Sequence, residues 1–349
     1  MGLFRILLAV SVLFAHVAKP NWYTGLGGEL AVESFFLISG FYMSRILTTT
    51  YSSKRHFYIN RSLRILPIYY FVLIATIMQL VLFAKVGIGE SFDWPNTRSE
   101  YLAFLPNFSI FGSDWVQFLN STYEGLTRVG ITDGVGSASK FLLIAPAWTL
   151  GLEFTFYLLA PFIVRLSKRD LSLIVIFFLT LRMLYWTLGY SQDPWSYRFI
   201  IFELPVFFLG VLAERVKASG QFRSEFSTRT IYLAVVTFYI LAGLTIQNTS
   251  IDYAYLLTLT VMFTLFVLLF SKNADRDRKI GELSYPLYLC HILTISSTAA
   301  ILEKLGFFNL SHSRGFFEIL MLVLSVLVAK VLLGMASPVE RLRDKIRNA

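Results

Sequence analysis

Two histidines and two glutamates stand out because they interrupt long apolar stretches of the sequence: His16, His291, Glu33 and Glu153. An ionisable side chain at membrane depth is costly, so each is a candidate for function. A neutral imidazole suits general-base and nucleophilic roles near neutral pH, and a carboxylate can orient a neighbouring group or accept a proton. These residue types predict acid–base or group-transfer chemistry. Packed or interfacial side chains are the alternative, and it stays open at this point.

The spacing of the basic residues adds a second kind of chemistry. Arg5 lies 11 positions before His16, almost three helical turns, so both lie on one helix face about 16 Å apart along its axis. Arg61 and Arg64 are three positions apart, a spacing at which two guanidinium groups can grip a phosphate. Contact with lipid headgroups is the alternative for both arginines.

Further polar residues accompany these candidates along the chain. The segment around Glu33 also contains Ser39 and Gly40, which is too polar for a helix that meets only lipid. Trp148 precedes Glu153 in a segment that closes with Pro161. A late segment begins at Ser284, which can cap a helix, and continues through Tyr288 to His291, two turns from Ser284 on the same face. The remaining histidines, His56 and His312, fall in predicted loops.

The elements that must position these residues are membrane helices. The chain is 56% apolar and 15% charged, with a mean hydropathy of +0.62, against about 25% charged residues in soluble domains. This composition excludes a disordered chain and argues against an ordinary cytosolic enzyme. A span needs about 20 mostly apolar residues. Ten segments qualify, near 4–19, 28–47, 63–85, 142–164, 171–189, 198–214, 230–247, 253–271, 283–302 and 315–335.

The distribution of basic residues gives an orientation. With the first residue inside, alternation through ten spans assigns 21 Lys and Arg residues to cytoplasmic segments, 8 to outer segments and two to spans. Lys and Arg accumulate in cytoplasmic loops, so this ratio favours ten helices with both termini cytoplasmic. It also explains the net charge of +9 without nucleic acid. The predicted fold is therefore an all-α, polytopic membrane helix bundle in the lipid bilayer.

The chain is predicted to be one integral-membrane domain over residues 1–349, with no separate soluble domain. Its one long outer segment, 87–140, is rich in glycine, serine and aromatic residues and predicts a structured but irregular cap. The single cysteine, Cys290, excludes an internal disulfide and a thiolate metal cluster. No metal site and no bound cofactor are expected.

Taken together, the motifs resemble those of the membrane acyltransferase-3 family, bacterial integral-membrane proteins that O-acylate extracytoplasmic sugars. Arg5 and His16 match its Arg-x10-His motif, and Phe35–Phe41 is similar to its second-helix signature. Arg61 to Pro67 looks like its Arg-x-x-Arg-apolar-x-Pro segment. Trp148 to Glu153 and Ser284 to His291 resemble its Trp-Ser-Leu-x-x-Glu and Ser-Tyr-x-x-Tyr-x-x-His blocks. Two departures are Thr149 in place of the usual serine and Glu33-Ser34 where an aspartate is common.

The resemblance implies an enzyme that transfers an acyl group, with acetyl-CoA as the expected donor and co-substrate, to a hydroxyl of an extracytoplasmic carbohydrate. His16 is the predicted base or transient acyl carrier, Glu153 its supporting carboxylate and His291 a second catalytic or structural residue. Arg5, Arg61 and Arg64 are predicted to bind the donor. Site-lining roles go to Glu33, Ser39, Trp148, Ser284 and Tyr288.

Other functions fit the same polar residues. A transporter or flippase of a glycoconjugate would use intramembrane Glu and Arg for coupling and binding, although no internal repeat is detectable. A non-catalytic membrane scaffold would use them only to pack helices. The acceptor remains open among O-antigen, exopolysaccharide, lipo-oligosaccharide and a small glycoside, and the sequence predicts no oligomeric state. The resemblance implies the bacterial cytoplasmic membrane.

Overall fold

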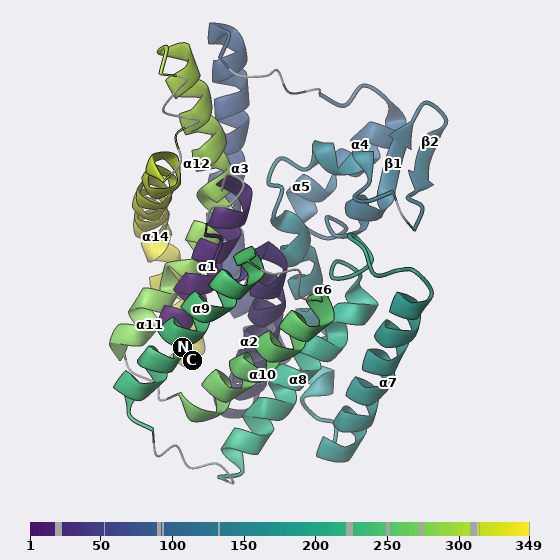
Figure 1. Cartoon of the computed structure of the whole chain (residues 1–349), viewed down its shortest axis with the longest axis vertical. Coiled ribbons are helices and arrows are strands. Elements are labelled where there is room, and N and C mark those ends of the chain that lie inside the picture. The colour runs from purple at the N-terminus through teal and green to yellow at the C-terminus, as the bar shows by residue number, and fades with distance from the viewer. Residues whose placement is uncertain are drawn as a thin grey trace. The chain divides into compact units, whose positions relative to one another are not determined.

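The computed structural model in Figure 1 describes the chain except residues 18–22, 52, 89–91, 93, 132, 221–225, 249–251, 272–274, 308–312, 314 and 349. It divides into two compact units. The first contains Met1–Phe35, Arg55–Ser91 and Val216–Ala349, and the second contains Phe36–Lys54 and Phe92–Arg215. The prediction of a single integral-membrane domain stays a prediction.

The first unit is built around one short apolar helix, α1 (Gly2–Val17). It packs against α9 (Thr228–Asn248), α11 (Asp275–Glu282), α12 (Ser284–Lys304) and α14 (Phe316–Asn348), and α12 also packs against α14. The unit also contains α3 (Lys54–Val86) from Arg55 onward, α10 (Tyr253–Phe270) and the first part of α2 (Gly27–Thr49). Both motif residues lie on α1, Arg5 half-buried and His16 exposed near the end of the helix.

The second unit combines helices with a small irregular region. Its helices are the later part of α2, α6 (Ala147–Ile163), α7 (Lys168–Thr187) and α8 (Ile200–Ala218) up to Arg215. The irregular region contains short helices, two 3-10 turns and one antiparallel hairpin, in which Leu119 pairs with Arg128. These elements are α4 (Arg98–Phe104), α5 (Pro106–Ser109), η1 (Trp115–Phe118), β1 (Leu119–Thr122), β2 (Gly125–Arg128) and η2 (Ser137–Phe141).

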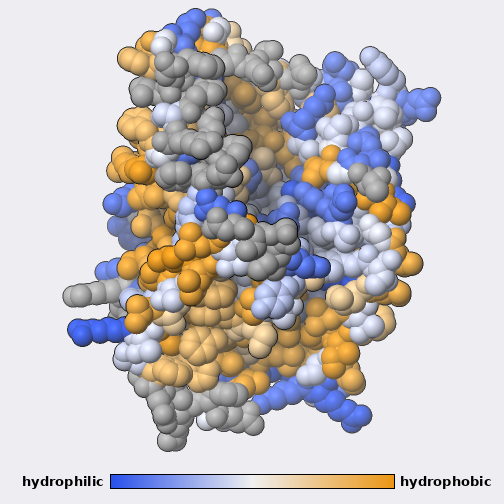
Figure 2. Space-filling view, in the orientation of Figure 1, coloured by the Kyte–Doolittle hydropathy of each residue, from blue (hydrophilic) through white to orange (hydrophobic). Residues whose placement is uncertain are grey.

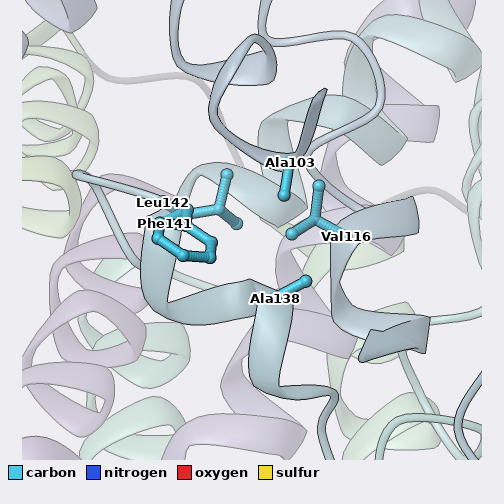
Figure 3. Packing of buried hydrophobic residues seen from close by; sticks show 5 residues of the cluster. All are labelled: Ala103, Val116, Ala138, Phe141 and Leu142. Carbon is cyan, nitrogen blue, oxygen red and sulfur yellow. The ribbon is translucent and has the colours of Figure 1, made fainter. Parts of the chain in front are cut away.

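A small apolar core holds this irregular region together. Figure 3 shows its five buried side chains, contributed by α4, η1, η2 and the residue that follows η2: Ala103, Val116, Ala138, Phe141 and Leu142. Thr97 and Glu100 form a capping box at the start of α4, which satisfies backbone N–H groups there. The described residues of 87–140 thus form short helices, turns and a hairpin, and the assignment of this segment as an outer cap stays a prediction.

Two glycines let the helices of the second unit approach closely. A Cβ atom on Gly40 would collide with the carbonyl oxygen of Phe207, and one on Gly210 would collide with that of Leu37. Beside this contact, the Phe207 ring stacks on Phe36 with centroids 4.7 Å apart and on Phe156 at 4.3 Å. The small residues at the crossing therefore allow α2, α6 and α8 to pack through a continuous aromatic stack.

Among the described residues, seven helices are long and apolar enough to cross a membrane by length and composition, and the chain is an integral membrane protein. They are Gly27–Thr49, Lys54–Val86, Lys168–Thr187, Thr228–Gln247, Tyr253–Phe270, Asp277–Lys304 and Phe316–Ile346. In Figure 2, hydrophobic side chains cover much of the surface over these helices, whereas the region of α4, β1 and β2 is mostly hydrophilic. The all-α fold class is confirmed.

The ten predicted spans each coincide with a helix, but the number of crossings stays a prediction. Gly2–Val17 and Ala147–Ile163 are apolar but shorter than 18 residues, and Ile200–Ala218 is not among the seven. The cytoplasmic location of both termini is likewise still a prediction.

Several predicted boundaries were wrong. The helix expected from 63 begins at Lys54, so His56 is helical rather than in a loop, Arg61 is also helical, and Pro67 lies inside that helix. The helix expected from 142 begins at Ala147, after Pro146, and the one expected to end at 335 continues to Asn348. Ser284 does not cap its helix, because Leu283 occupies the cap position and the Ser284 hydroxyl donates to the carbonyl of Gly281. His312 lies outside the described residues.

Candidate active site

The packing of α1 against α12 brings the two candidate histidines together. The ring centroids of His16 and His291 are 4.9 Å apart, and the rings are tilted by 58°. His16 lies near the end of α1 and is exposed, whereas His291 lies two turns into α12 and is fully buried. The structure thus joins residues 275 positions apart in sequence into one imidazole pair, and only one member of it is accessible.

Both imidazoles are anchored through the same ring nitrogen. Nδ1 of His16 lies 2.7 Å from the carbonyl oxygen of Val12, and Nδ1 of His291 lies 2.6 Å from that of Tyr288. A carbonyl oxygen can only accept, so each Nδ1 must carry the hydrogen and donate it. In the neutral rings each Nε2 then has a lone pair available to accept a proton. Nε2 of His291 has no hydrogen-bond partner among the described residues.

Aromatic and polar side chains surround this pair. The Tyr288 ring is 6.0 Å from the His291 ring and 6.0 Å from the Phe35 ring of α2, so Tyr288 lies within the predicted site. Glu33, two positions before Phe35, is completely buried. The described contacts therefore place Tyr288 beside the imidazole pair. For Glu33 they show burial, and its site-lining role stays a prediction.

A hydrogen-bond network fixes α1 and the turn that follows it. The Ser11 hydroxyl accepts from the backbone N–H of Leu26 at 3.1 Å and lies 3.3 Å from the hydroxyl of Tyr239 in α9. The Tyr23 hydroxyl donates to the backbone carbonyl of Tyr239 at 2.6 Å. Sequence reasoning missed these residues, because a serine and two tyrosines in apolar segments give no signal until α1 and α9 are packed together. They tie α1, at Ser11, to α9 and to the turn at Leu26.

The predicted donor-binding arginines lie in the first unit. Arg61 is buried, and its guanidinium lies 3.4 Å from the amide oxygen of Asn60, whose own amide donates to the carbonyl of Arg343 in α14. Arg64, one turn later on α3, is half-buried. Arg5 lies near the end of α11, because a Cβ on Gly281 would come within 3.5 Å of its guanidinium. Arg61 and Arg64 share one helix face, as their spacing predicts.

In the second unit, Glu153 is the centre of a carboxylate–hydroxyl cluster with Ser39 and Tyr157. The Ser39 hydroxyl donates to Glu153 Oε1 at 2.9 Å, and the Tyr157 hydroxyl donates to the same oxygen. Tyr157 lies one turn after Glu153 on α6, so helix geometry alone makes this contact accessible. The described hydrogen bonds of Glu153 therefore go to hydroxyl groups, and its role as the support of a histidine stays a prediction.

Trp148 lies in the first turn of α6, within a cluster of aromatic and charged side chains. Its buried ring is 5.4 Å from the ring of Tyr197, and the guanidinium of Arg198 lies 4.4 Å from its centroid. Arg198 is held by Asp193 through contacts of 2.5 and 2.8 Å and also reaches Gln117 at 3.3 Å. Arg198 and Asp193 carried no motif signal. Among the residues predicted as site-lining, Trp148 thus joins a separate cluster.

The described side chains contain no group of three His, Cys, Asp or Glu residues that could hold a metal ion. The hydroxyl of buried Ser284, seven residues before His291, donates to the backbone carbonyl of Gly281. Within the described contacts, the predicted site residues thus form two groups: His16, His291 and Tyr288 in the first unit, and Ser39 with Glu153 in the second.

Comparison with known proteins gives one family. A model of the acyltransferase domain matches residues 1–335. Nodulation protein 10 of Rhizobium leguminosarum bv. viciae is 32% identical over 184 residues, which cover 48% of this chain and 44% of that protein. No solved structure matches the chain.

Two further relatives are named for peptidoglycan modification. The putative peptidoglycan O-acetyltransferase YrhL of Bacillus subtilis strain 168 is 25% identical over 162 residues. The peptidoglycan O-acetyltransferase OatA of Listeria monocytogenes serovar 1/2a is 26% identical over 162 residues. In both cases the match covers 45% of this chain and 22% of the relative, so the chain matches less than half of each of these three proteins.

Proposed function

The chain belongs to the acyltransferase domain family, and on this premise we propose that it transfers an acyl group to a hydroxyl of an extracytoplasmic sugar. The observation that carries the proposal is the imidazole pair of His16 and His291, in which both Nδ1 atoms are anchored on carbonyls. This arrangement leaves Nε2 of each neutral ring as a base, and acyl transfer to a hydroxyl needs a base.

His16 is the group that we propose takes the proton of the acceptor hydroxyl, because it is the exposed member of the pair. A role as transient acyl carrier fits the anchoring less well. Acylation at Nε2 while Nδ1 keeps its hydrogen would give a cationic acylimidazolium, and the carbonyl oxygen of Val12 is too weak a base to neutralise it. We therefore favour general-base catalysis at His16 over a covalent intermediate.

We propose an acyl-CoA, with acetyl-CoA as the first choice, as the donor. Its phosphates are polyanions, and Arg61 and Arg64 present two guanidinium groups on one face of α3, with Arg5 on α1 as a third candidate. Replacing Arg64 with glutamine should raise the KM for the donor more than it lowers kcat, because a phosphate contact far from the reacting carbon contributes mainly to binding.

The second unit supplies the remaining proposed roles. Glu153 holds two hydroxyl groups, those of Ser39 and Tyr157, and we assign to it the orientation of these groups rather than proton removal from the acceptor. Trp148, packed against Arg198 and Tyr197, is the proposed carbohydrate-side aromatic residue. Two relatives are named for O-acetylation of peptidoglycan, which makes a cell-envelope glycan the first acceptor class to test. The proposed location is the bacterial cytoplasmic membrane.

The test uses the full chain purified into lipid nanodiscs, with acetyl-CoA as donor and solubilised peptidoglycan fragments and neutral oligosaccharides as acceptor probes. The expected product is heavier than the acceptor by about 42 Da per acetyl group, since the acyl group replaces one hydroxyl proton. Omission of acetyl-CoA should remove the product. In parallel, mass spectrometry of surface glycans from cells with and without the gene covers acceptors absent from the panel.

Transport of a glycoconjugate without acylation gives a different result. Labelled sugar would then cross the bilayer of proteoliposomes independently of acetyl-CoA, and its mass would not change. That outcome, together with unmodified surface glycans, would overturn the proposed function.

A further inference from the structure

The buried ring of His291 has one nitrogen that the fold does not use. Its Nδ1 donates to the carbonyl of Tyr288 at 2.6 Å, but Nε2 is buried and has no hydrogen-bond partner among the described residues. The side chain has no exposed surface. A buried polar atom without a partner is destabilising, and such atoms in native structures are often connected with function.

Of the rings that the described contacts place against His291, the one with the shorter centroid separation is another imidazole. The His16 ring lies 4.9 Å from the His291 ring, and its Nδ1 is likewise occupied, by the carbonyl of Val12 at 2.7 Å. Each ring therefore has its Nε2 edge directed away from its own helix backbone. Two such bases can share one proton, whereas two positively charged imidazolium ions at this separation would repel each other.

Two polar residues lie beside His291 in the described part of the chain, Cys290 and Tyr288. The Cys290 thiol lies 3.6 Å from the carbonyl oxygen of Ser325 in α14, and Tyr288 contributes its carbonyl to His291 and its ring to Phe35. In the described contacts, neither Cys290 nor Tyr288 forms a hydrogen bond with Nε2 of His291. His16 is thus the only base that the described contacts place against the His291 ring.

We propose that His291 is a positioning and proton-sharing partner of His16, so that the imidazole pair, rather than His16 alone, accepts the proton of the sugar hydroxyl. This inference rests on the proposed function and adds to it the assignment of His291. The pair spreads one positive charge over two rings, and the anchored Nδ1 atoms keep both Nε2 atoms available.

The step balances with an acyl thioester as the donor. The oxygen of the acceptor hydroxyl forms a bond to the acyl carbon, and the hydroxyl proton passes to Nε2 of His16. That proton is then shared between Nε2 of His16 and Nε2 of His291. The carbon–sulfur bond breaks with its electron pair on sulfur. The imidazole pair then transfers the proton to the thiolate, so the products are a sugar ester and a free thiol.

The decisive variant is His291→Asn. The Asn amide nitrogen takes the place of Nδ1 and can still donate to the carbonyl of Tyr288, but no nitrogen remains at the position of Nε2. Acetyl transfer from acetyl-CoA is measured in nanodiscs with the acceptor found for the wild-type protein. We expect kcat to fall about 100-fold, with the KM for donor and acceptor and the unfolding temperature close to wild type.

Three comparisons make the test specific. His291→Phe removes both ring nitrogens and should lower kcat at least as much, and should also lower the unfolding temperature because the Tyr288 carbonyl loses its partner. His56→Asn, a histidine on α3 outside the pair, should behave as wild type. In a His16→Ala background, His291→Asn should cause little further loss of the residual rate, since His291 acts through His16.

Two results would overturn the assignment. One is a His291→Asn protein with wild-type kcat. The other is an equal loss from His291→Asn in the wild-type and His16→Ala backgrounds, which is the additive behaviour of a structural residue. Full activity of His16→Ala, in contrast, would contradict the assignment of the base in the proposed function and would be recognised separately.

Discussion

The imidazole pair of the first unit and the carboxylate–hydroxyl cluster of the second unit solve the problem of polar groups in apolar surroundings in opposite ways. In the pair, each histidine uses Nδ1 to hold its ring, and Nε2 of the buried His291 has no hydrogen-bond partner among the described residues. In the cluster, one oxygen of Glu153 accepts hydrogen bonds from both Ser39 and Tyr157. The difference teaches that a proton acceptor and an orienting group can be distinguished by whether their lone pairs are already engaged.

The comparison predicts its largest effect at His16. Replacement by alanine removes the exposed base, and we expect the rate of acyl transfer to fall by about 10²–10⁴, the usual contribution of general acid–base catalysis. Protein level and unfolding temperature in detergent should change little, because the side chain is exposed and its described hydrogen bond goes to its own helix. Retention of full activity would remove the distinction between the two regions.

A smaller loss is expected at the carboxylate. Glu153→Gln keeps an oxygen that can accept from Ser39 or Tyr157 but removes the charge, and we expect about a 10–100-fold decrease in kcat, typical of orienting groups. Tyr157→Phe and Ser39→Ala, measured singly and in combination with Glu153→Gln, should show non-additive effects because the three residues share one oxygen. If kcat falls as much in Glu153→Gln as in His16→Ala, the assignment of Glu153 as an orienting group rather than a base would be contradicted.

The packing around the carboxylate–hydroxyl cluster gives a prediction about the free energy of unfolding rather than about the rate of acyl transfer. Gly40, next to Ser39, cannot carry a Cβ without displacing the backbone of Phe207. Gly40→Ala should therefore lower the free energy of unfolding by about 1–3 kcal/mol, as overpacking does. Gly334→Ala is the matched control, because a Cβ at this helical glycine meets no atom within 4 Å. Equal unfolding temperatures for the two variants would contradict the close helix crossing.

The smallest effect concerns a carboxyl group outside the membrane-spanning helices. Asp114 is buried next to Gly151, and burial raises its pKa to about 6. In the unfolded chain an aspartate titrates near pH 3.9, so between about pH 4 and 6 the folded state binds more protons. Stability contributed by the neutral form is therefore lost as the pH rises through this window, by on the order of 1–3 kcal/mol.

Asp114→Asn tests this effect, because the amide does not titrate. Its unfolding temperature, measured from pH 4 to 7, should depend less on pH than that of the wild type and should be higher above pH 6. Parallel pH curves for the two proteins would show that Asp114 is not the group responsible.

The helices could be predicted from the sequence to a large extent, because runs of about 20 apolar residues are a strong signal of membrane helices. The start of α3 was missed because the segment from Lys54 to Arg64 is too polar to resemble a membrane span. This polar segment nevertheless forms the first turns of the same helix. The hairpin of β1 and β2 was also missed. Its two strands have four residues each and no alternating apolar pattern.

The candidate site was predictable residue by residue but not as an arrangement. Helix periodicity placed Arg5 and His16 on one face of α1, and this depends only on positions within one element. The contact of His16 with His291 depends on how α1 packs against α12, which no local spacing encodes. The same holds for Glu153 and Ser39, which are brought together by the crossing of helices and not by sequence proximity.

Cys290 has a practical consequence for anyone who labels this protein. It is the only cysteine in the chain, it is fully buried, and its sulfur faces the backbone carbonyl of Ser325. In the folded native protein, the Cys290 thiol should therefore react very slowly with maleimide reagents. Single cysteines introduced at exposed Tyr123 and at Arg341 would then react alone, and a membrane-impermeant maleimide would assign each end of the helices to its side of the bilayer.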